Sequence, residues 1–207
     1  MQETFLFNLV EDSISELTET FFSTPYLFYT ENDIHCHFHN LLSKQLQDSG
    51  FGIYETLDKK LSILLHKEYP TKKKYRRKLL EEHPTGTRGH FDLCLWNPEE
   101  VSKRLFQSKN SNEISMEQQT IFAFELFLAE GRGEGSLEHA ITHTKWDMLK
   151  LKDNEVKHGY ILFFARDWEF GEGFLKRIKE QKIPSNTILV YIEKNHSQNF
   201  TQRLGSF

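Results

Sequence analysis

Three nearly continuous apolar segments in the second half of the chain constrain its fold most strongly. They are residues 121–129 (IFAFELFLA), 159–165 (GYILFFA) and 187–193 (TILVYIE). A strand that is apolar on both of its faces is typical of the interior of a sheet that is covered by helices on both sides. We therefore expect these segments to be buried strands of such a sheet.

Helical spacing and turn signals predict the other elements. We expect helices at residues 5–21, 30–49, 136–152 and 173–182, and strands at 61–70 and 89–96, with Thr30 and Ser136 as N-caps, Pro70 as the end of its strand and a long loop or partly helical insert at 98–118. Three successive strands predict an antiparallel meander, and the later alternation of helix and strand predicts parallel crossovers. The fold class is therefore α/β, with a mixed central sheet flanked by helices.

The length of 207 residues suits one well-cored domain. We expect an N-terminal helical extension at residues 1–28, a core at 30–193 and a polar tail at 195–207. The net charge of −4 is no overall signature of nucleic-acid binding. Only two cysteines are present, which predicts a reducing, cytoplasmic compartment. No apolar run approaches ~20 residues, and the first ten residues lack a basic segment, so we expect neither a membrane span nor a signal peptide.

Two central acids interrupt otherwise apolar strands. Side chains alternate along a strand, so Asp92 shares a face with His90, while Glu125 shares a face with Phe127. A buried carboxylate costs several kcal/mol unless a cation pairs with it. Two adjacent strands that each point one carboxylate the same way can bind Mg²⁺. The alternative is that Asp92 and Glu125 form structural salt bridges.

Two further acids could join this pair. Glu68 lies near the end of its expected strand, and Glu31 lies in the first turn of the helix that Thr30 begins. Glu31 falls among the apolar positions of that helix, so it faces the interior. Compensation of the helix dipole is the alternative role for Glu31, and a solvated strand end is the alternative for Glu68.

The order of these acids and elements resembles the restriction-endonuclease-like, or PD-(D/E)xK, nuclease superfamily. That family has an αβββαβ core with an acid in the first helix or strand, an Asp on a hairpin strand and Glu-x-Lys on the next strand. The matching pieces, which span residues 30–165, are Glu31 or Glu68, then GHFDLCLW with Asp92, then FAFELF with Glu125, then the helix at 136–152 and the strand at 159–165.

The resemblance implies Mg²⁺ or Mn²⁺ bound by Asp92, Glu125 and Glu68, and hydrolysis of phosphodiester bonds in DNA or RNA. Whether the chain forms a homodimer stays open. Phe127 occupies the position of the family's lysine. Lys145 or His90 is then the candidate for the missing cation, and Glu31 completes the candidate catalytic set. The other hypothesis is a catalytically inactive nuclease-fold domain that binds nucleic acid or protein.

A basic run follows the strand that carries Glu68. Its members are Lys72, Lys73, Lys74, Arg76, Arg77 and Lys78. Lysine and arginine contact the phosphate backbone of nucleic acids, whereas a solvated loop is the simpler explanation. Two histidine pairs with a spacing of four residues, His35 with His39 and His139 with His143, could suggest zinc, but we expect solvated helix surface at both.

Overall fold

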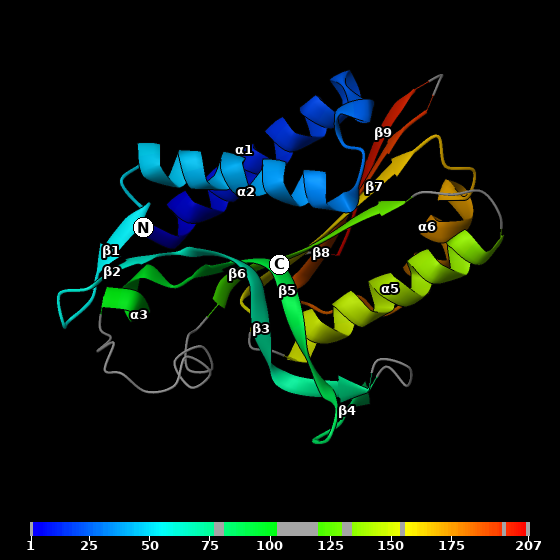
Figure 1. Cartoon of the computed structure of the whole chain (residues 1–207). Coiled ribbons are helices and arrows are strands. Elements are labelled where there is room, and N and C mark those ends of the chain that lie inside the picture. Colours follow the sequence, from blue (N-terminus) through cyan, green and yellow to red (C-terminus); the bar gives the residue numbers. More distant parts are fainter. Residues whose placement is uncertain are drawn as a thin grey trace.

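A mixed sheet with strand order β4-β3-β5-β6-β7-β8-β9 organises the fold (Figure 1). The computed structural model describes residues 2–76, 81–102, 120–129, 134–153, 156–195 and 198–205. The strands are β3 (Leu65–Arg76), β4 (Glu81–Glu82), β5 (Thr87–Trp96), β6 (Thr120–Ala129), β7 (His158–Arg166), β8 (Thr187–Lys194) and β9 (Asn199–Leu204). A separate hairpin pairs β1 (Ile53–Glu55) with β2 (Leu61–Ile63).

The pairing directions confirm the predicted α/β class and its mixed sheet. Strands β3, β5 and β6 are antiparallel neighbours, whereas β6, β7 and β8 run parallel. The three parallel strands are the three apolar segments of the sequence, and nearly all of their residues are buried. A strand whose two faces are both covered needs apolar side chains on both, which explains the missing alternation.

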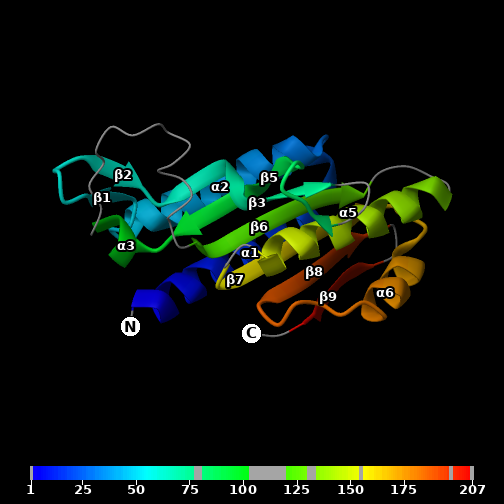
Figure 2. The same ribbon diagram turned by 90° about the horizontal axis from the view of Figure 1, so that it is seen from below.

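Helices cover both faces of the sheet. The described helices are α1 (Gln2–Ser23), α2 (Glu31–Asp48), α3 (Pro98–Ser102), α5 (Glu134–Asp153) and α6 (Gly171–Lys179), with a 3-10 turn, η1 (Pro25–Leu27). Helices α1 and α2 lie on one face, and Figure 2 shows α5 and α6 over the other. Aromatic packing fixes both layers: Phe38 of α2 meets Phe124 of β6 edge-on at 5.2 Å, and Phe174 of α6 stacks on Phe163 of β7 at 4.2 Å between ring centroids.

Several expected boundaries are wrong. Strand β3 does not stop at Pro70 but continues to Arg76, so the basic run belongs to a strand. At Pro70, β3 pairs with β5 on one side, while β4 pairs only with Tyr75 and Arg76, so a residue without an N–H is tolerated at this nearly open edge. Helix α5 begins before Ser136, which therefore lies inside the helix.

The two ends of the described chain are integrated into the core. Helix α1 buries Leu6, Val10 and Phe21 completely, so it belongs to the covering layer. The expected polar tail instead contains β9, which pairs antiparallel with β8. Of the expected insert at 98–118, residues 98–102 form α3, and 103–118 lie outside the described residues. Among the described helices, none is long and apolar enough to cross a membrane.

Candidate functional site

Strands β5 and β6 separate in the middle of the sheet, and this separation creates the candidate site. Their ladder pairs Cys94 with Ala123 and Leu93 with Phe124. Beyond that point, the N–H of Leu126 donates to Oδ2 of Asp92 at 2.7 Å. The N–H of Leu128 donates to Oε2 of Glu31 at 3.4 Å. Two carboxylates thus satisfy backbone donors of β6 that a paired strand would otherwise satisfy.

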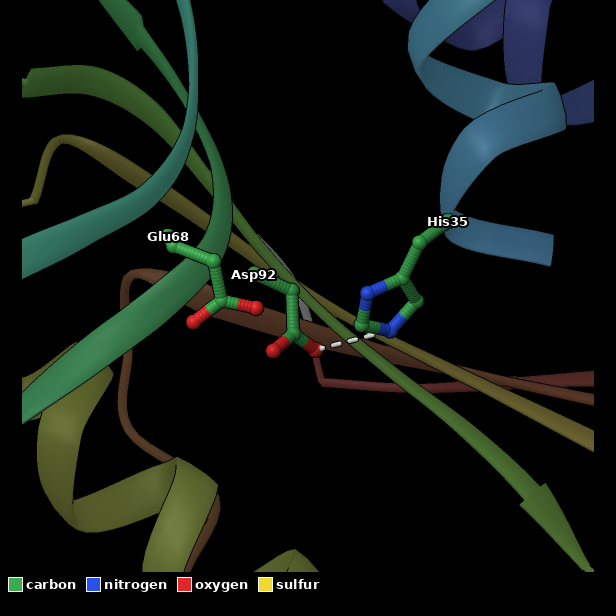
Figure 3. Close-up of side chains that lie close together, drawn as sticks. All are labelled: His35, Glu68 and Asp92. Carbon is green, nitrogen blue, oxygen red and sulfur yellow. Dashed lines mark ion pairs between the residues drawn. The ribbon is translucent and has the colours of Figure 1, made fainter. Parts of the chain in front are cut away.

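Three side chains from three elements converge at this separation. His35 of α2, Glu68 of β3 and Asp92 of β5 each offer a ligand atom, and these atoms lie within 4.8 Å of one another (Figure 3). Nε2 of His35 is 3.4 Å from Oδ2 of Asp92. Among the described residues, this is the group of acidic and imidazole side chains whose spacing suits one metal ion.

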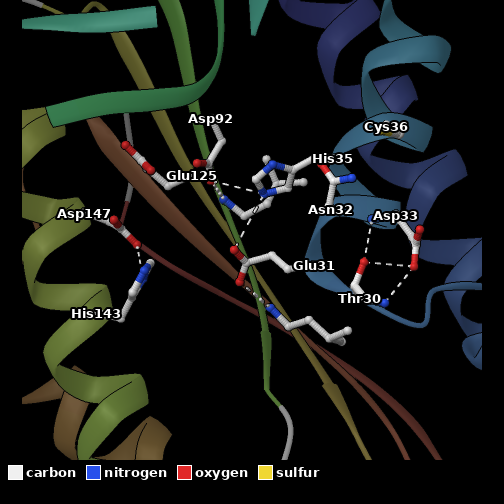
Figure 4. A network of polar contacts seen from close by, with 12 residues as sticks. Thr30, Glu31, Asn32, Asp33, His35, Cys36, Asp92, Glu125, His143 and Asp147 are labelled. Carbon is white, nitrogen blue, oxygen red and sulfur yellow. Dashed lines mark hydrogen bonds and ion pairs between the residues drawn. The ribbon is translucent and has the colours of Figure 1, made fainter. Parts of the chain in front are cut away.

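The start of α2 sets the position of His35. Thr30 caps the helix by accepting from the N–H of Asp33, and the backbone N–H of Thr30 donates to the Asp33 carboxylate, which together form a capping box. Glu31 and His35 follow one turn apart, so both face the sheet at the strand separation (Figure 4). The prediction that Glu31 faces inward is thus consistent with its contact to Leu128.

Glu68 has an unusual backbone conformation. Its φ is 53°, in the left-handed region, although it lies within β3. Its neighbours Lys67 and Tyr69 pair with Leu93 and Phe91, so Glu68 lies across from Asp92. The left-handed conformation costs a non-glycine residue about 1–2 kcal/mol, and such strain is often found at functional sites.

The electrostatics of His35 and Asp92 favour a bound cation. Burial lowers the pKa of His35, and its buried Nε2 makes no hydrogen bond, so the neutral imidazole has a nitrogen available to a ligand. Because a neutral His35 carries no charge, its 3.4 Å contact with Asp92 is not an ion pair in that state. Burial also raises the pKa of Asp92 to about 7, although the Lys150 charge opposes this rise. A divalent cation would offset the cost of this buried charge.

Glu125 takes part in a separate buried chain of charges. Its Oε2 lies 2.6 Å from Nζ of Lys150, and only 1% of Glu125 is exposed. Lys150 also contacts Oδ1 of Asp147 at 3.1 Å, and Oδ2 of Asp147 lies 3.0 Å from Nδ1 of His143. Oε1 of Glu125 is buried without a hydrogen bond, and burial raises the pKa of this carboxyl.

The cation beside Glu125 is Lys150, and neither Lys145 nor His90 takes this place. Lys145 is about 140° away from Lys150 around α5, because each residue turns a helix by ~100°. Lys145 is half-buried and its charge acts on Glu138. The side chain of His90 is exposed, although its backbone oxygen accepts a hydrogen bond from Lys150 at 3.1 Å.

A sequence signal for Lys150 does exist. His143, Asp147 and Lys150 recur at spacings of four and three residues, which places them on one face of α5. Their neighbours Thr144 and Leu151 are buried, so this polar face is turned toward the sheet. Charged residues inside an apolar helical face indicate a buried polar network.

Phe127 fills the expected lysine position with an aromatic contact. Its ring stacks on Phe163 at 4.9 Å and lies 5.0 Å from the ring of His143, between centroids. The residue is 8% exposed. Its side chain therefore packs β6 against β7 and α5.

Three of the four histidines in the two pairs are at least half-buried. His35 is buried and belongs to the candidate site, so solvated surface was the wrong expectation for it. His39 and His143 are half-buried, while His139 is exposed. The helical spacing alone could not distinguish these cases, because exposure depends on what packs against the helix.

The basic run lies on the distal part of β3. Lys73 pairs with Glu82 at 2.8 Å, whereas Lys74 and Arg76 are exposed. Tyr75 between them is buried and meets the ring of Trp146 edge-on at 4.9 Å. Arg77, Lys78 and the side chain of Lys72 lie outside the described residues. Contact with nucleic acid stays a prediction.

The fold and the convergent side chains define a mixed α/β protein with a candidate divalent-metal site. No protein-family model, curated protein or solved structure matches the chain. The functional conclusion therefore rests on the geometry of the site.

Proposed function

We propose that this chain is a metal-dependent nuclease of the PD-(D/E)xK superfamily that hydrolyses phosphodiester bonds of DNA or RNA. The observation that carries the proposal is the convergence of His35, Glu68 and Asp92 where β5 leaves β6. The ordered pair Asp92 and Glu125 on these two strands agrees with the sequence resemblance.

His35, Glu68 and Asp92 would hold Mg²⁺ or Mn²⁺. Two carboxylates are hard oxygen ligands, and one imidazole is compatible with Mn²⁺ in particular. The ion would lower the pKa of a bound water and neutralise charge on the phosphate. Glu125 was expected among the ligands, but its ion pair with Lys150 gives it a different immediate partner.

Lys150 supplies a cation at Glu125 in place of the family's lysine. Burial alone would lower its pKa, but Glu125 and Asp147 outweigh burial and raise that pKa above its usual value. A lysine that stays protonated cannot accept a proton from water. Its role would be to hold Glu125 and to add positive charge near the phosphate.

A cleavage assay with a mixed substrate panel tests the proposal. Single- and double-stranded DNA and RNA are incubated with the purified chain in Mg²⁺, in Mn²⁺ or in EDTA. We expect cleavage that needs the metal and that Asp92→Asn and Glu68→Gln each reduce by about 100-fold or more, since losing even an outer-shell partner of a metal typically costs ~10–100-fold.

Asp12→Asn is the matched control, because Asp12 is exposed on α1 and belongs to no cluster described above. It should cleave as the unmodified chain does. Cleavage that persists in EDTA, or that survives both Asp92→Asn and Glu68→Gln, would contradict the proposal.

A second candidate function is nucleic-acid or protein binding without hydrolysis. The 2.6 Å contact between Lys150 and Glu125 favours it, since this buried pair occupies a carboxylate that the family uses for metal. In that case, nucleic acid would bind without being cleaved, and charge reversal at Lys74 and Arg76 would weaken the binding and its salt dependence.

A further inference from the structure

His143 and Asp147 form an oriented pair on the face of α5 that meets β6. Nδ1 of His143 lies 3.0 Å from Oδ2 of Asp147, and the Asp147 side chain is 1% exposed. Asp147 is itself held by Lys150 at 3.1 Å. A carboxylate that holds Nδ1 fixes the tautomer and the ring orientation, and it leaves Nε2 as the nitrogen that can serve a ligand.

The ring of His143 lies next to an open space. A cavity of about 360 Å³ is lined by residues that include Glu31, Phe127, His139 and Trp168. The His143 ring contacts two of these residues, Phe127 at 5.0 Å and His139 at 6.0 Å between centroids. Its side chain is 21% exposed, so solvent reaches part of the ring.

The side chain of Glu31 connects this cavity to the proposed nuclease site. Glu31 lines the cavity and is one helical turn from His35, which belongs to the metal group. Figure 4 shows His143 and Asp147 on α5 across from Glu31, His35 and Asp92. Glu31 therefore borders both the cavity and the metal group.

We propose that His143 is the general acid of this site, which donates the proton of Nε2–H to the leaving oxygen, with Asp147 as its positioning residue. This inference rests on the proposed nuclease function. A bond forms between phosphorus and the water oxygen while the bond between phosphorus and the leaving sugar oxygen breaks. The leaving oxygen takes the proton from Nε2. The proton released by the water passes to solvent, from which His143 is protonated again.

The surrounding charges support a protonated His143. Asp147, Lys150 and the ring of His139 approach it from α5, Glu31 faces it from α2, and the β6 residue against it is the uncharged Phe127. Burial lowers the pKa of His143, but Asp147, aided by Glu31, outweighs burial and the Lys150 charge, so the pKa is raised. A general acid works best when its pKa is near the operating pH.

Substrates with a different leaving atom test this role. The probes are oligonucleotides that carry one bridging sulfur in place of the leaving oxygen, on the 3′ or the 5′ side, alongside the normal oligonucleotide in Mg²⁺. A thiolate leaves without being protonated, so its departure does not need an acid. We expect His143→Gln to cleave the normal substrate ~100-fold more slowly or worse, which is the usual contribution of a general acid.

The sulfur substrate should be cleaved by His143→Gln at nearly the rate of the unmodified chain. Cleavage of the sulfur substrate also shows that the His143→Gln variant is folded and binds substrate. The rate of the unmodified chain on the normal substrate should fall toward alkaline pH, and this fall should be absent in His143→Gln. His39→Gln on α2 is the matched histidine control and should behave as the unmodified chain on both substrates.

Two results would overturn the role of His143 while leaving the nuclease intact. One is a His143→Gln variant that cleaves the normal substrate at the full rate. The other is an equal loss on the oxygen and sulfur substrates, which would assign His143 to structure or binding. If the unmodified chain cleaves neither substrate, the proposed function itself fails, and this inference fails with it.

Discussion

Nζ of Lys150 lies 2.6 Å from Oε2 of Glu125, and both side chains are almost fully buried. Strand β6 carries Phe127 where the Glu-x-Lys pattern has a lysine. Helix α5 instead places the cation of Lys150 beside Glu125. The pair also links Glu125 to Asp147 and His143, so four ionisable side chains form one connected unit.

Removal of the Lys150 charge should destabilise the fold. In Lys150→Met, Glu125 and Asp147 lose their shared cation, and breaking a buried pair from one side costs about 3–5 kcal/mol. Urea unfolding at pH 7 measures this loss in the free energy of unfolding. Lys145→Met is the control, since Lys145 is half-buried on another face of α5, and it should change that free energy little. Adding Glu125→Gln to Lys150→Met should restore part of the loss, and a strictly additive double variant would count against the pairing.

Asp92 should make the fold less stable as pH rises. Its pKa is raised to about 7 from 3.8, so the folded state binds a proton that the unfolded state releases near pH 4. The contribution of Asp92 is therefore fully present below about pH 4 and is lost as the pH rises through about 7. In EDTA, we expect Asp92→Asn to be more stable than the unmodified chain at pH 8 by about 1–4 kcal/mol and closer to it at pH 4.

The pKa of Asp33 is shifted in the opposite direction to that of Asp92, which allows a comparison. Hydrogen bonds from Thr30 lower the pKa of Asp33, so its stabilising effect is lost as the pH falls through that lowered pKa. Asp33→Asn should therefore weaken the fold at neutral pH, whereas Asp92→Asn should strengthen it. Equal effects of the two substitutions at pH 8 would argue against a costly buried charge at Asp92.

Mn²⁺ should stabilise the folded chain through His35, Glu68 and Asp92. A ligand that binds only the folded state adds about 2.7 kcal/mol at 100 times its Kd. Thermal unfolding should therefore shift upward with added Mn²⁺ and return with EDTA. His35→Gln and Glu68→Gln should each reduce the shift, while Asp12→Asn should retain it. An unchanged shift in both site variants would place the ion elsewhere.

A lysine at position 127, where the Glu-x-Lys pattern has one, should not create a more active chain. Phe127→Lys would bury an ammonium among the rings of Phe163 and His143, near the existing Lys150 charge. Loss of a buried phenyl group typically costs about 3–5 kcal/mol. We expect lower stability and no gain in cleavage, whereas Phe127→Leu should retain more of both. A gain in cleavage by Phe127→Lys would show that Lys150 does not replace the missing cation.

Much of the fold could be predicted because a strand that is buried on both faces has an apolar residue at nearly every position. The runs that became β6, β7 and β8 are apolar throughout, and their parallel pairing followed from the helices between them. The extent of β3 could not be predicted in this way. Pro70 normally ends a strand, and only its position at a nearly open sheet edge explains why β3 continues.

The candidate site was predictable where strand alternation determines direction. Asp92 and Glu125 could be assigned to one face because neighbouring strands share a pleat. His35 and Lys150 could not be assigned by the same reasoning, since each lies on a helix whose distance from the sheet depends on tertiary packing. The left-handed backbone of Glu68 had no signal at all, because only glycine would have revealed it.

The Leu126 N–H donates a hydrogen bond to Asp92, so this carboxylate stabilises the fold whether or not the chain catalyses a reaction. A related chain without hydrolytic activity would still gain from an acceptor at that position, because the buried strand amide of Leu126 would otherwise lack one. The presence of Asp92 in a related chain would therefore say little about whether that chain is a working enzyme. Glu68 is the more informative position, since its strained backbone has no comparable structural return.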